Sequence, residues 1–312
     1  MSRHRAVDRP RAPWQGGTRE ALAGLGLDTG WVHEFVLGAL SEDLGPHWID
    51  VTTAATVPVD DDGRAELQMH EDGVICGLPL LPVVLAEAAA RFDLPVPTAR
   101  LRVSDGARVR RGDVLAEVQG PARVLITAER TALNIVRHLS GIATVAAMWV
   151  EALEGSGAGL LDTRATTPGL RPLERYAVRC GGGTNGRAGL YDAAHVTVAH
   201  TMAAGSVERA LDAVRLRMPD VLVQIDVRTP LEAVEAVLAG ARFIVCEGMD
   251  ADVLAGAVRQ IRAATPEPVE IAASGLSDLG LAKEYAQTGV DHLYVDSLTQ
   301  HAMALDVGMV IA

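Results

Sequence analysis

Residues 161–192 read LDTRATTPGLRPLERYAVRCGGGTNGRAGLYD. This stretch carries five arginines and a run of three glycines, and it has few bulky apolar side chains. An apolar segment, GAGLLDT, leads into it, and a second apolar segment, LYDAAHVTV, leads out of it. The pattern predicts a long polar crossover between two buried strands, not a linker between domains.

The arginines of this crossover have two interpretations. Guanidinium groups pair bidentately with carboxylates and phosphates, and successive glycines let backbone N–H groups approach a ligand closely. Arg171, Arg175 and Arg179 follow one another at helical spacing, which favours structural pairing with acids of the chain. Arg164 and Arg187 lie next to the strand ends, which favours contact with an anionic ligand.

Composition narrows the classes of protein. The chain has 312 residues, of which 49% are hydrophobic and 22% charged, so a large core and two domains are expected. A net charge of -12 argues against non-specific nucleic-acid binding but allows a small anionic substrate. Three widely spaced cysteines suit a reducing compartment, and we see no apolar run near the ~20 residues of a membrane span. We therefore expect a cytoplasmic protein with neither nucleic-acid nor membrane partners.

The chain contains a single lysine, Lys283, in the amphipathic pattern LGLAKEYAQTG. This pattern predicts that the lysine faces solvent. Schiff-base chemistry and a phosphate-binding P-loop lysine are therefore excluded, and no organic cofactor is expected. Any phosphate must be bound by arginine, by backbone N–H groups or by a metal.

Two different patterns of helices and strands along the sequence predict an α/β protein of two domains. Residues 1–25 are expected to form a disordered extension. Residues 26–128 combine helical patterns with alternating strands, which indicates an α+β domain of a helix pair packed against a sheet. Residues 129–300 alternate short apolar strands with helices, which is typical of a parallel sheet. The tail, residues 301–312, is expected to pack back on the first of these domains.

Individual helices and strands can also be predicted within this division. The spacing of apolar residues predicts a helix over 31–45, and DVTTAATVP at 50–58 reads as a strand. A long helix is predicted over 127–153, with a break at Ser140-Gly141. The strands of the second domain fit a closed α/β barrel better than an open sheet; they are GAGLLDT, AAHVTVA, VLVQIDV, RFIVCEG, VEIAASG and VDHLYVD.

In an α/β barrel the chemistry lies at the carboxyl ends of the strands. In this chain those ends carry polar or small residues. They are Asp162, Arg164, His195, Thr197, Gln224, Asp226, Arg228, Glu247, Ser274, Gly275 and Asp296.

Motifs along the chain resemble those of the quinolinate phosphoribosyltransferase family (nicotinate-nucleotide pyrophosphorylase, carboxylating). They are EDLG (42–45), DVTT (50–53), EDGVICGLP (71–79), GPARVLITAERTALN (120–134), HLSGIAT (138–144), LDTRATTPGLRPLERYAVRCGGGTN (161–185) and LYDA (190–193). The resemblance runs from about residue 30 to the end. It implies an N-terminal α/β sandwich and an incomplete α/β barrel of six to seven strands. It also implies a homodimer with a shared active site, or a higher oligomer.

The reaction that the resemblance implies uses Mg²⁺ and transfers the ribosyl phosphate of phosphoribosyl pyrophosphate to the ring nitrogen of quinolinate. Pyrophosphate leaves, and the ring loses one carboxylate. In the family, three arginines hold the substrate carboxylates. The resemblance places them at Arg130, Arg164 and Arg187, and it implies that Arg130 reaches the site of the other subunit of the dimer. Arg137 and His138 match a polar pair on the same helix wall.

The phosphoribosyl side is also matched by position. The resemblance assigns phosphate and ribose contacts to Thr163, Gln224, Ser274, Gly275 and Asp296. It assigns the binding of Mg²⁺ and of the ribose hydroxyls to Asp226 and Glu247. It adds His200 as a third catalytic residue.

Several of these positions depart from the family pattern. Ala165 and Thr197 stand where the family has lysines, Gly186 and Gln300 where it has histidines, and Asp296 where it has a glycine. A carboxylate at 296 opposes pyrophosphate binding, by several tenths to roughly a few kcal/mol in a partly desolvated site.

Three hypotheses follow from this retention of arginines and loss of lysines. The first is a phosphoribosyltransferase acting on quinolinate or a related aromatic acid of NAD or specialised metabolism. The second is a diverged decarboxylase, lyase or hydrolase that binds a carboxylate or nucleotide and uses His195, His200 and Glu247 for proton transfer. The third is a ligand-binding homologue without catalytic activity.

Overall fold

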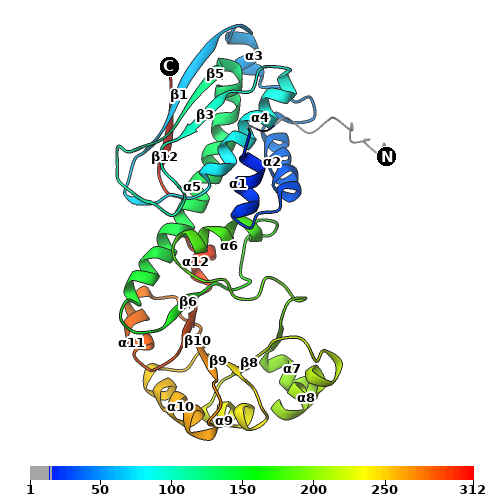
Figure 1. Cartoon of the computed structure of the whole chain (residues 1–312), viewed down its shortest axis with the longest axis vertical. Coiled ribbons are helices and arrows are strands. Elements are labelled where there is room, and N and C mark those ends of the chain that lie inside the picture. The colour runs from blue at the N-terminus through cyan, green and yellow to red at the C-terminus, as the bar shows by residue number, and fades with distance from the viewer. Residues whose placement is uncertain (1–13, 15) are drawn as a thin grey trace. The chain divides into compact units, whose positions relative to one another are not determined.

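The computed structural model describes residue 14 and residues 16–312, which fall into two compact units (Figure 1). Unit 1 extends to Ser140 and includes Ala304–Ala312, and unit 2 is Gly141–Met303. The division between the units falls within α5 (Ala122–Ala152). This helix continues through Ser140-Gly141, so the predicted break is wrong, and the predicted domain boundary at 128 and 129 also lies within it.

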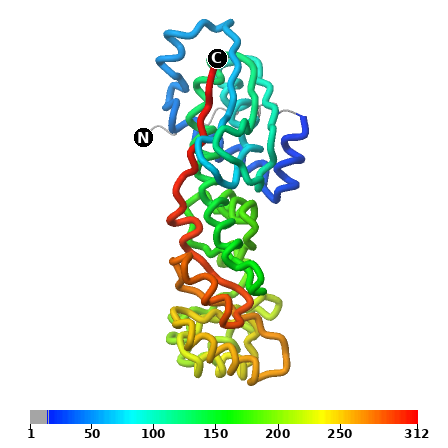
Figure 2. The backbone as a smooth tube through the Cα atoms, turned by 90° about the vertical axis from the view of Figure 1, so that its left-hand side faces the viewer, coloured from blue at the N-terminus to red at the C-terminus, as the bar shows by residue number. Residues whose placement is uncertain are grey.

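Unit 1 is built on a four-stranded antiparallel sheet in the order β12-β1-β5-β3. The C-terminal strand β12 pairs with β1 at one edge, as the red end of the tube in Figure 2 shows. The strands are β1 (Asp62–Met69), β3 (Thr98–Leu101), β5 (Val114–Pro121) and β12 (Val307–Ile311), with the small pair β2 (Gly73–Val74) and β4 (Arg108–Val109). The helices are α1 (Thr18–Gly24), α2 (Thr29–Leu44), α3 (Val51–Thr56), η1 (Leu78–Leu80) and α4 (Leu81–Phe92).

Two predictions for this unit need correction. Residues 18–24 of the expected disordered extension form α1, because Leu22 is fully buried there; residues 1–13 and 15 lie outside the described residues. The predicted strand at 50–58 contains α3 instead. The Asp50 side chain caps this helix by accepting hydrogen bonds from the backbone N–H groups of Thr52 (3.1 Å) and Thr53 (3.0 Å).

Unit 2 contains the six predicted strands in one sheet, and every pairing in it is parallel. The order is β6-β11-β10-β9-β8-β7, so β6 and β7 form the two edges of an incomplete barrel (Figure 1). The strands are β6 (Gly159–Leu161), β7 (Ala194–Val196), β8 (Val223–Val227), β9 (Phe243–Glu247), β10 (Glu270–Ser274) and β11 (His292–Tyr294). The incomplete α/β barrel that the family resemblance implies is confirmed. The closed barrel expected from the strand pattern is wrong, because β6 and β7 remain edges of the described sheet.

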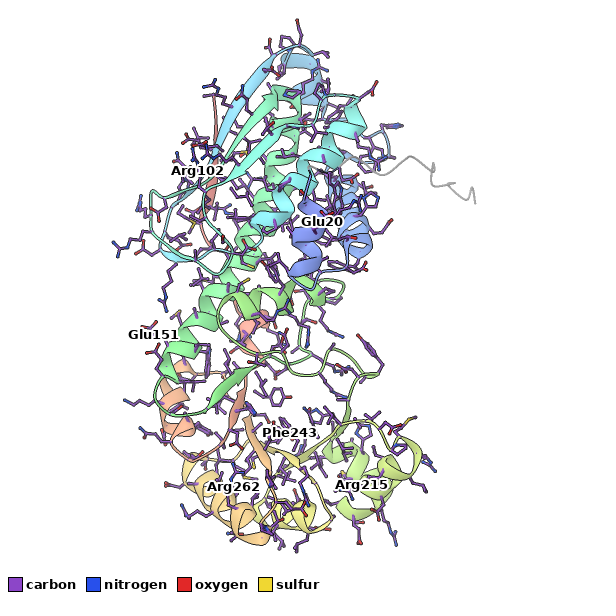
Figure 3. The ribbon with its side chains drawn as sticks, in the orientation of Figure 1. Glu20, Arg102, Glu151, Arg215, Phe243 and Arg262 are labelled. Atoms are coloured by element: carbon purple, nitrogen blue, oxygen red, sulfur yellow. The ribbon has the colours of Figure 1, made fainter. Side chains whose placement is uncertain are left out.

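Helices connect the strands of unit 2 and cover the outside of the sheet. They are α6 (Arg171–Cys180), α7 (Val198–Ala204), α8 (Val207–Arg217), α9 (Pro230–Leu238), α10 (Ala251–Ala264), η2 (Leu279–Leu281), α11 (Ala282–Ala286) and α12 (Ser297–Gln300). Arg215 and Arg262, labelled in Figure 3, tie α8 and α10 to neighbouring segments. Arg215 donates to the Ala239 carbonyl (2.5 Å), and Arg262 forms an ion pair with Asp291 (2.7 Å) just before β11.

The inner face of this sheet follows the two-residue alternation of strands. Leu161, Val245, Ala272 and Tyr294 form a buried cluster from four strands, and Phe243 of β9 packs against it (Figure 3). This apolar layer supports the polar residues at the carboxyl ends of the same strands.

Helix α5 is long and apolar enough, by length and composition alone, to cross a membrane. Its most apolar 18-residue window has a mean hydropathy of 1.2, and 61% of that window is buried inside the protein. Burial of this extent is typical of a core helix.

Candidate active site

A cavity of about 390 Å³ lies within unit 2 at the carboxyl ends of the strands. Seven of the residues that the family resemblance assigns to the site contribute to its wall. The lining consists of Asp162, Thr163, Arg164, Ala165, Arg187, His195, Gln224, Asp226, Val245, Ser274, Tyr294 and Asp296.

Arginines of α6 hold the polar crossover in place. Arg175 donates to the carbonyls of Gly186 (2.9 Å) and Arg187 (3.0 Å). Arg171 donates to Thr166 Oγ1 (3.0 Å) and the Ala188 carbonyl (3.2 Å). Arg179 contacts the Asn185 side chain at 2.7 Å. The structural interpretation of these three arginines is therefore confirmed, although their partners are mainly carbonyls and neutral side chains.

Asp162, at the end of β6, is the acidic centre of this loop. Its carboxylate accepts hydrogen bonds from the Gly186 N–H (2.7 Å) and the Asn185 amide (2.6 Å), and Arg175 lies 3.4 Å away. The residue is 1% exposed, and its burial raises the pKa of the Asp162 carboxyl to about 6, against the opposing influence of Arg175. These bonds fix the backbone that carries Arg187.

The glycine run serves packing, which corrects the expectation that its N–H groups face a ligand. The N–H groups of Gly181, Gly182 and Gly183 donate to carbonyls of α6, at 3.1, 2.9 and 3.0 Å. A Cβ atom on Gly181 would lie 2.3 Å from the Ala143 carbonyl oxygen of α5. The small residue therefore allows close contact between two helices of the unit.

Arg164 and Arg187 both line the cavity, as the ligand interpretation requires. The pKa of Arg187 is lowered, first by burial and second by the positive charge of Arg164. The guanidinium of Arg187 also donates to the Ala193 carbonyl (3.3 Å). Two neighbouring cations at the wall of one cavity favour an anionic ligand, because the ligand would relieve their repulsion.

Asp226, on β8, shares the cavity with a histidine from β7. His195 Nε2 lies 2.5 Å from Asp226 Oδ1, and the two side chains are 18% and 14% exposed. Asp296 accepts a hydrogen bond from Thr163 Oγ1, and Ser274 also lines the cavity. The wall of the cavity therefore carries both arginines and carboxylates.

Tyr294 is a lining residue that sequence reasoning missed. It ends β11, is 7% exposed, and its hydroxyl lies 3.1 Å from Gln224 Nε2. The pKa of this hydroxyl is raised by burial. The available signal was an aromatic residue near the end of the predicted strand VDHLYVD. That signal does not distinguish a core residue from a site residue.

Comparisons with known proteins agree with this arrangement. The C-terminal domain of quinolinate phosphoribosyl transferase matches residues 142–310, and its N-terminal domain matches residues 50–140. The chain belongs to the quinolinate phosphoribosyltransferase family.

Relatives in this family match over nearly their full length. The chain is 43% identical over 274 residues to the nicotinate-nucleotide pyrophosphorylase [carboxylating] of Mycobacterium leprae, covering 87% of this chain and 94% of the relative. It is 33% identical to quinolinate phosphoribosyltransferase [decarboxylating] 1 of Nicotiana glauca, covering 88% and 80%. The solved nicotinate-nucleotide pyrophosphorylase of Francisella tularensis superposes with a TM-score of 0.84 at 29% identity, covering 92% and 98%.

Three residues assigned from the family pattern lie outside the cavity lining. Glu247 contacts Arg228 at 3.4 Å on the exposed rim. His200 accepts a hydrogen bond from the Thr197 N–H (3.1 Å) and closes the first turn of α7 as a capping box. Gly275 has a φ of 88° and lies next to the Gly248 backbone.

The remaining assigned residues belong to unit 1. Arg130, Arg137 and His138 all lie on α5, and Arg130 is exposed. Arg137 forms an ion pair with Asp306, so its charge is balanced within unit 1. The assigned residues that do line the cavity all belong to unit 2.

Of the two residues that the family pattern assigns to a magnesium ion, Asp226 and Glu247, Asp226 alone lines the cavity. Oxygen ligands of this kind suit Mg²⁺. Its Oδ1 atom is occupied by His195, and Glu247 is paired with Arg228. Asp226 Oδ2 fits an ion that keeps most of its ligands as water and substrate oxygens.

Proposed function

We propose that the protein transfers a phosphoribosyl group from phosphoribosyl pyrophosphate to quinolinate or a related carboxylated aromatic ring. Membership of the family makes it a pentosyltransferase. Relatives that the chain covers to 94% and 80% of their length are named for the carboxylating or decarboxylating form of this reaction. The observation that carries the proposal is the convergence of Arg164 and Arg187 on one cavity of unit 2.

The proposed mechanism assigns a separate task to each part of the wall. Arg164 and Arg187 hold the ring carboxylates and so orient the ring nitrogen toward the ribose. Asp226 faces the same cavity, where its negative charge stabilises an oxocarbenium-like ribosyl group. Most of the rate enhancement comes from positioning and charge, so no protein nucleophile is required.

Mg²⁺, when bound, would neutralise charge on the pyrophosphate, and Asp226 is the cavity residue that would hold it. We also propose that the protein acts in the cytoplasm as a homodimer, or a higher oligomer, in which a second copy supplies Arg130. This arrangement would add a third guanidinium to the carboxylate site. The exposed position of Arg130 on α5 supports it.

Calorimetry tests the proposal directly. Phosphoribosyl pyrophosphate with Mg²⁺ is titrated into the protein with and without quinolinate, and pyrophosphate release is followed in parallel. Binding of both substrates with release of pyrophosphate is expected. An absence of donor binding under both conditions would contradict phosphoribosyl transfer.

A second candidate is a decarboxylase, lyase or hydrolase acting on a carboxylate or a preformed nucleotide. The His195–Asp226 contact favours it, because a histidine beside a carboxylate is a common proton-transfer arrangement. This candidate predicts turnover of the acid or nucleotide without any pyrophosphate donor. Turnover that depends strictly on the donor would exclude it.

A further inference from the structure

The floor of the cavity contains a polar contact between two strands that are not neighbours. Gln224 comes from β8 and Tyr294 from β11, with β9 and β10 between them. Their side chains meet because the sheet curls, and Ala272 on β10, between the two strands, belongs to the same buried cluster as Tyr294. Both residues line the cavity, and they are 9% and 7% exposed.

The pair has more donor hydrogens than its own contacts can use. Gln224 Nε2 lies 3.1 Å and Oε1 lies 3.3 Å from the Tyr294 hydroxyl oxygen. An amide nitrogen carries two hydrogens and a phenol carries one. Even when both contacts form, one donor hydrogen remains for a partner in the cavity. A buried donor without a partner is costly, so the floor favours a ligand that brings an acceptor atom.

Gly186 makes room for the tyrosine. A Cβ atom at this position would lie 2.8 Å from Tyr294 Cε1 and 3.1 Å from its hydroxyl oxygen. Any side chain at 186 would therefore displace the ring from the floor. The Gly186 backbone is held between Asp162 and Arg175, at 2.7 and 2.9 Å, and so cannot easily retreat.

The charges around the pair define which acceptor it can take. Arg187 lies close enough to affect the Tyr294 hydroxyl electrostatically, and so do Asp162 and Asp226. An uncharged donor beside an arginine can donate a hydrogen bond to an oxygen of the anionic group that the arginine attracts. This donor adds a hydrogen bond without burying another charge.

We propose that Gln224 and Tyr294 are specificity-determining residues that donate a hydrogen bond to one carboxylate oxygen of the aromatic acid. The inference rests on the proposed function, because it takes the arginine-bound ligand to be such an acid. The pair selects acids that place an acceptor at the cavity floor. Analogues that lack this oxygen leave a buried donor without a partner and bind less well.

The test compares three acids by calorimetry: quinolinate (pyridine-2,3-dicarboxylate), pyridine-2-carboxylate and pyridine-3-carboxylate. Each is titrated into the wild type, Tyr294→Phe and Gln224→Glu. Tyr294→Phe keeps the ring that packs on the floor. Gln224→Glu removes the amide donors, and the new carboxylate accepts the hydrogen of the Tyr294 hydroxyl. Tyr285→Phe, on α11 and outside the cavity lining, is the matched control.

We expect Tyr294→Phe to weaken quinolinate binding about fivefold to tenfold. The monocarboxylate that lacks the contacted group should bind the wild type and Tyr294→Phe equally. Gln224→Glu should weaken quinolinate more strongly, and Tyr285→Phe should change nothing. If Tyr294→Phe leaves all three affinities unchanged, or lowers all three by one factor, the selection by Gln224 and Tyr294 is refuted while the proposed function stands. If the wild type itself binds none of the acids, the proposed function fails and this inference fails with it.

Discussion

His195 Nε2 lies 2.5 Å from Asp226 Oδ1, and the two side chains meet at the cavity from adjacent parallel strands. In the strand register His195 is opposite Gln224, so the imidazole reaches diagonally toward the carboxyl end of β8. The contact fixes the rotamer of the carboxylate that we assign to the ribosyl group. It also provides the one histidine among the residues that line the cavity.

Substitution of His195 separates a positioning role from proton transfer. His195→Gln keeps an N–H donor near Asp226, whereas His195→Ala removes it. For phosphoribosyl transfer we expect kcat within about threefold of wild type for His195→Gln and a loss of about tenfold or more for His195→Ala. Steady-state kinetics with both substrates measures this. An equal, large loss in both variants would instead favour proton transfer by the imidazole.

The repulsion between Arg164 and Arg187 predicts a trade-off between stability and binding. Arg164→Gln removes one of the two cations, so the protein without ligand should melt roughly 1–2 °C higher, for about 0.5 kcal/mol of relieved repulsion. The increase in melting temperature that quinolinate causes in the wild type should be largely lost. Arg209→Gln, on α8, is the control and should change neither value. A lower melting temperature for Arg164→Gln would contradict the repulsion.

Asp296 is expected to weaken binding of the pyrophosphate donor. Its carboxylate lines the cavity, and its side chain makes no capping bond to α12, so it can be neutralised without loss of a helix cap. Asp296→Asn should tighten binding of phosphoribosyl pyrophosphate with Mg²⁺ by about threefold to thirtyfold, most strongly at low salt. Calorimetry at two ionic strengths measures the change. Weaker binding of the donor to Asp296→Asn would instead indicate that the carboxylate contacts a hydroxyl or a cation.

The strands of unit 2 could be predicted because each is a short apolar run separated from the next by an amphipathic helix. All six predicted strands enter one parallel sheet. Arg164 could also be predicted as a cavity residue, because it follows β6 and the carboxyl ends of parallel strands lie at one edge of a sheet. Arg187 lies before β7, so its prediction came from the family motif. The inferences about the strands and Arg164 need local patterns and topology alone.

Features that depend on register or tertiary packing could not be predicted in the same way. The His195–Asp226 contact needs the register of β7 on β8, and the Gln224–Tyr294 contact needs the curl of the whole sheet. The β-branched residues at 50–58 suggested a strand, but the cap at Asp50 stabilises a helix. None of these can be read from spacing along the chain.

Burial of Asp162 predicts an unusual dependence of stability on pH. The pKa of its carboxyl is about 6 in the folded protein and 3.8 ordinarily, so the folded state holds the proton more tightly. As pH rises from the ordinary pKa through the folded pKa, the free energy of unfolding should fall, and at pH 7 the total loss should reach roughly 3 kcal/mol. Asp162→Asn lacks this titration. Urea unfolding of both proteins from pH 4 to pH 7.5 measures the difference, which must vary with pH if the carboxyl titrates in this range.

The two glycines at the end of α6 should differ sharply in their tolerance of alanine. Gly181 has an ordinary φ of -78°, but an added Cβ would lie 2.3 Å from the Ala143 carbonyl oxygen and 2.6 Å from the Ala146 Cβ. Gly182 has a φ of 89°, and its added Cβ would meet only the Val150 side chain at 3.5 Å or more. Gly182→Ala should therefore cost about 1–2 kcal/mol of backbone strain. Gly181→Ala should cost about 3 kcal/mol or more, because α6 and α5 must separate. Thermal unfolding of the two variants measures this order, and a Gly181→Ala protein as stable as Gly182→Ala would refute the close packing of these helices.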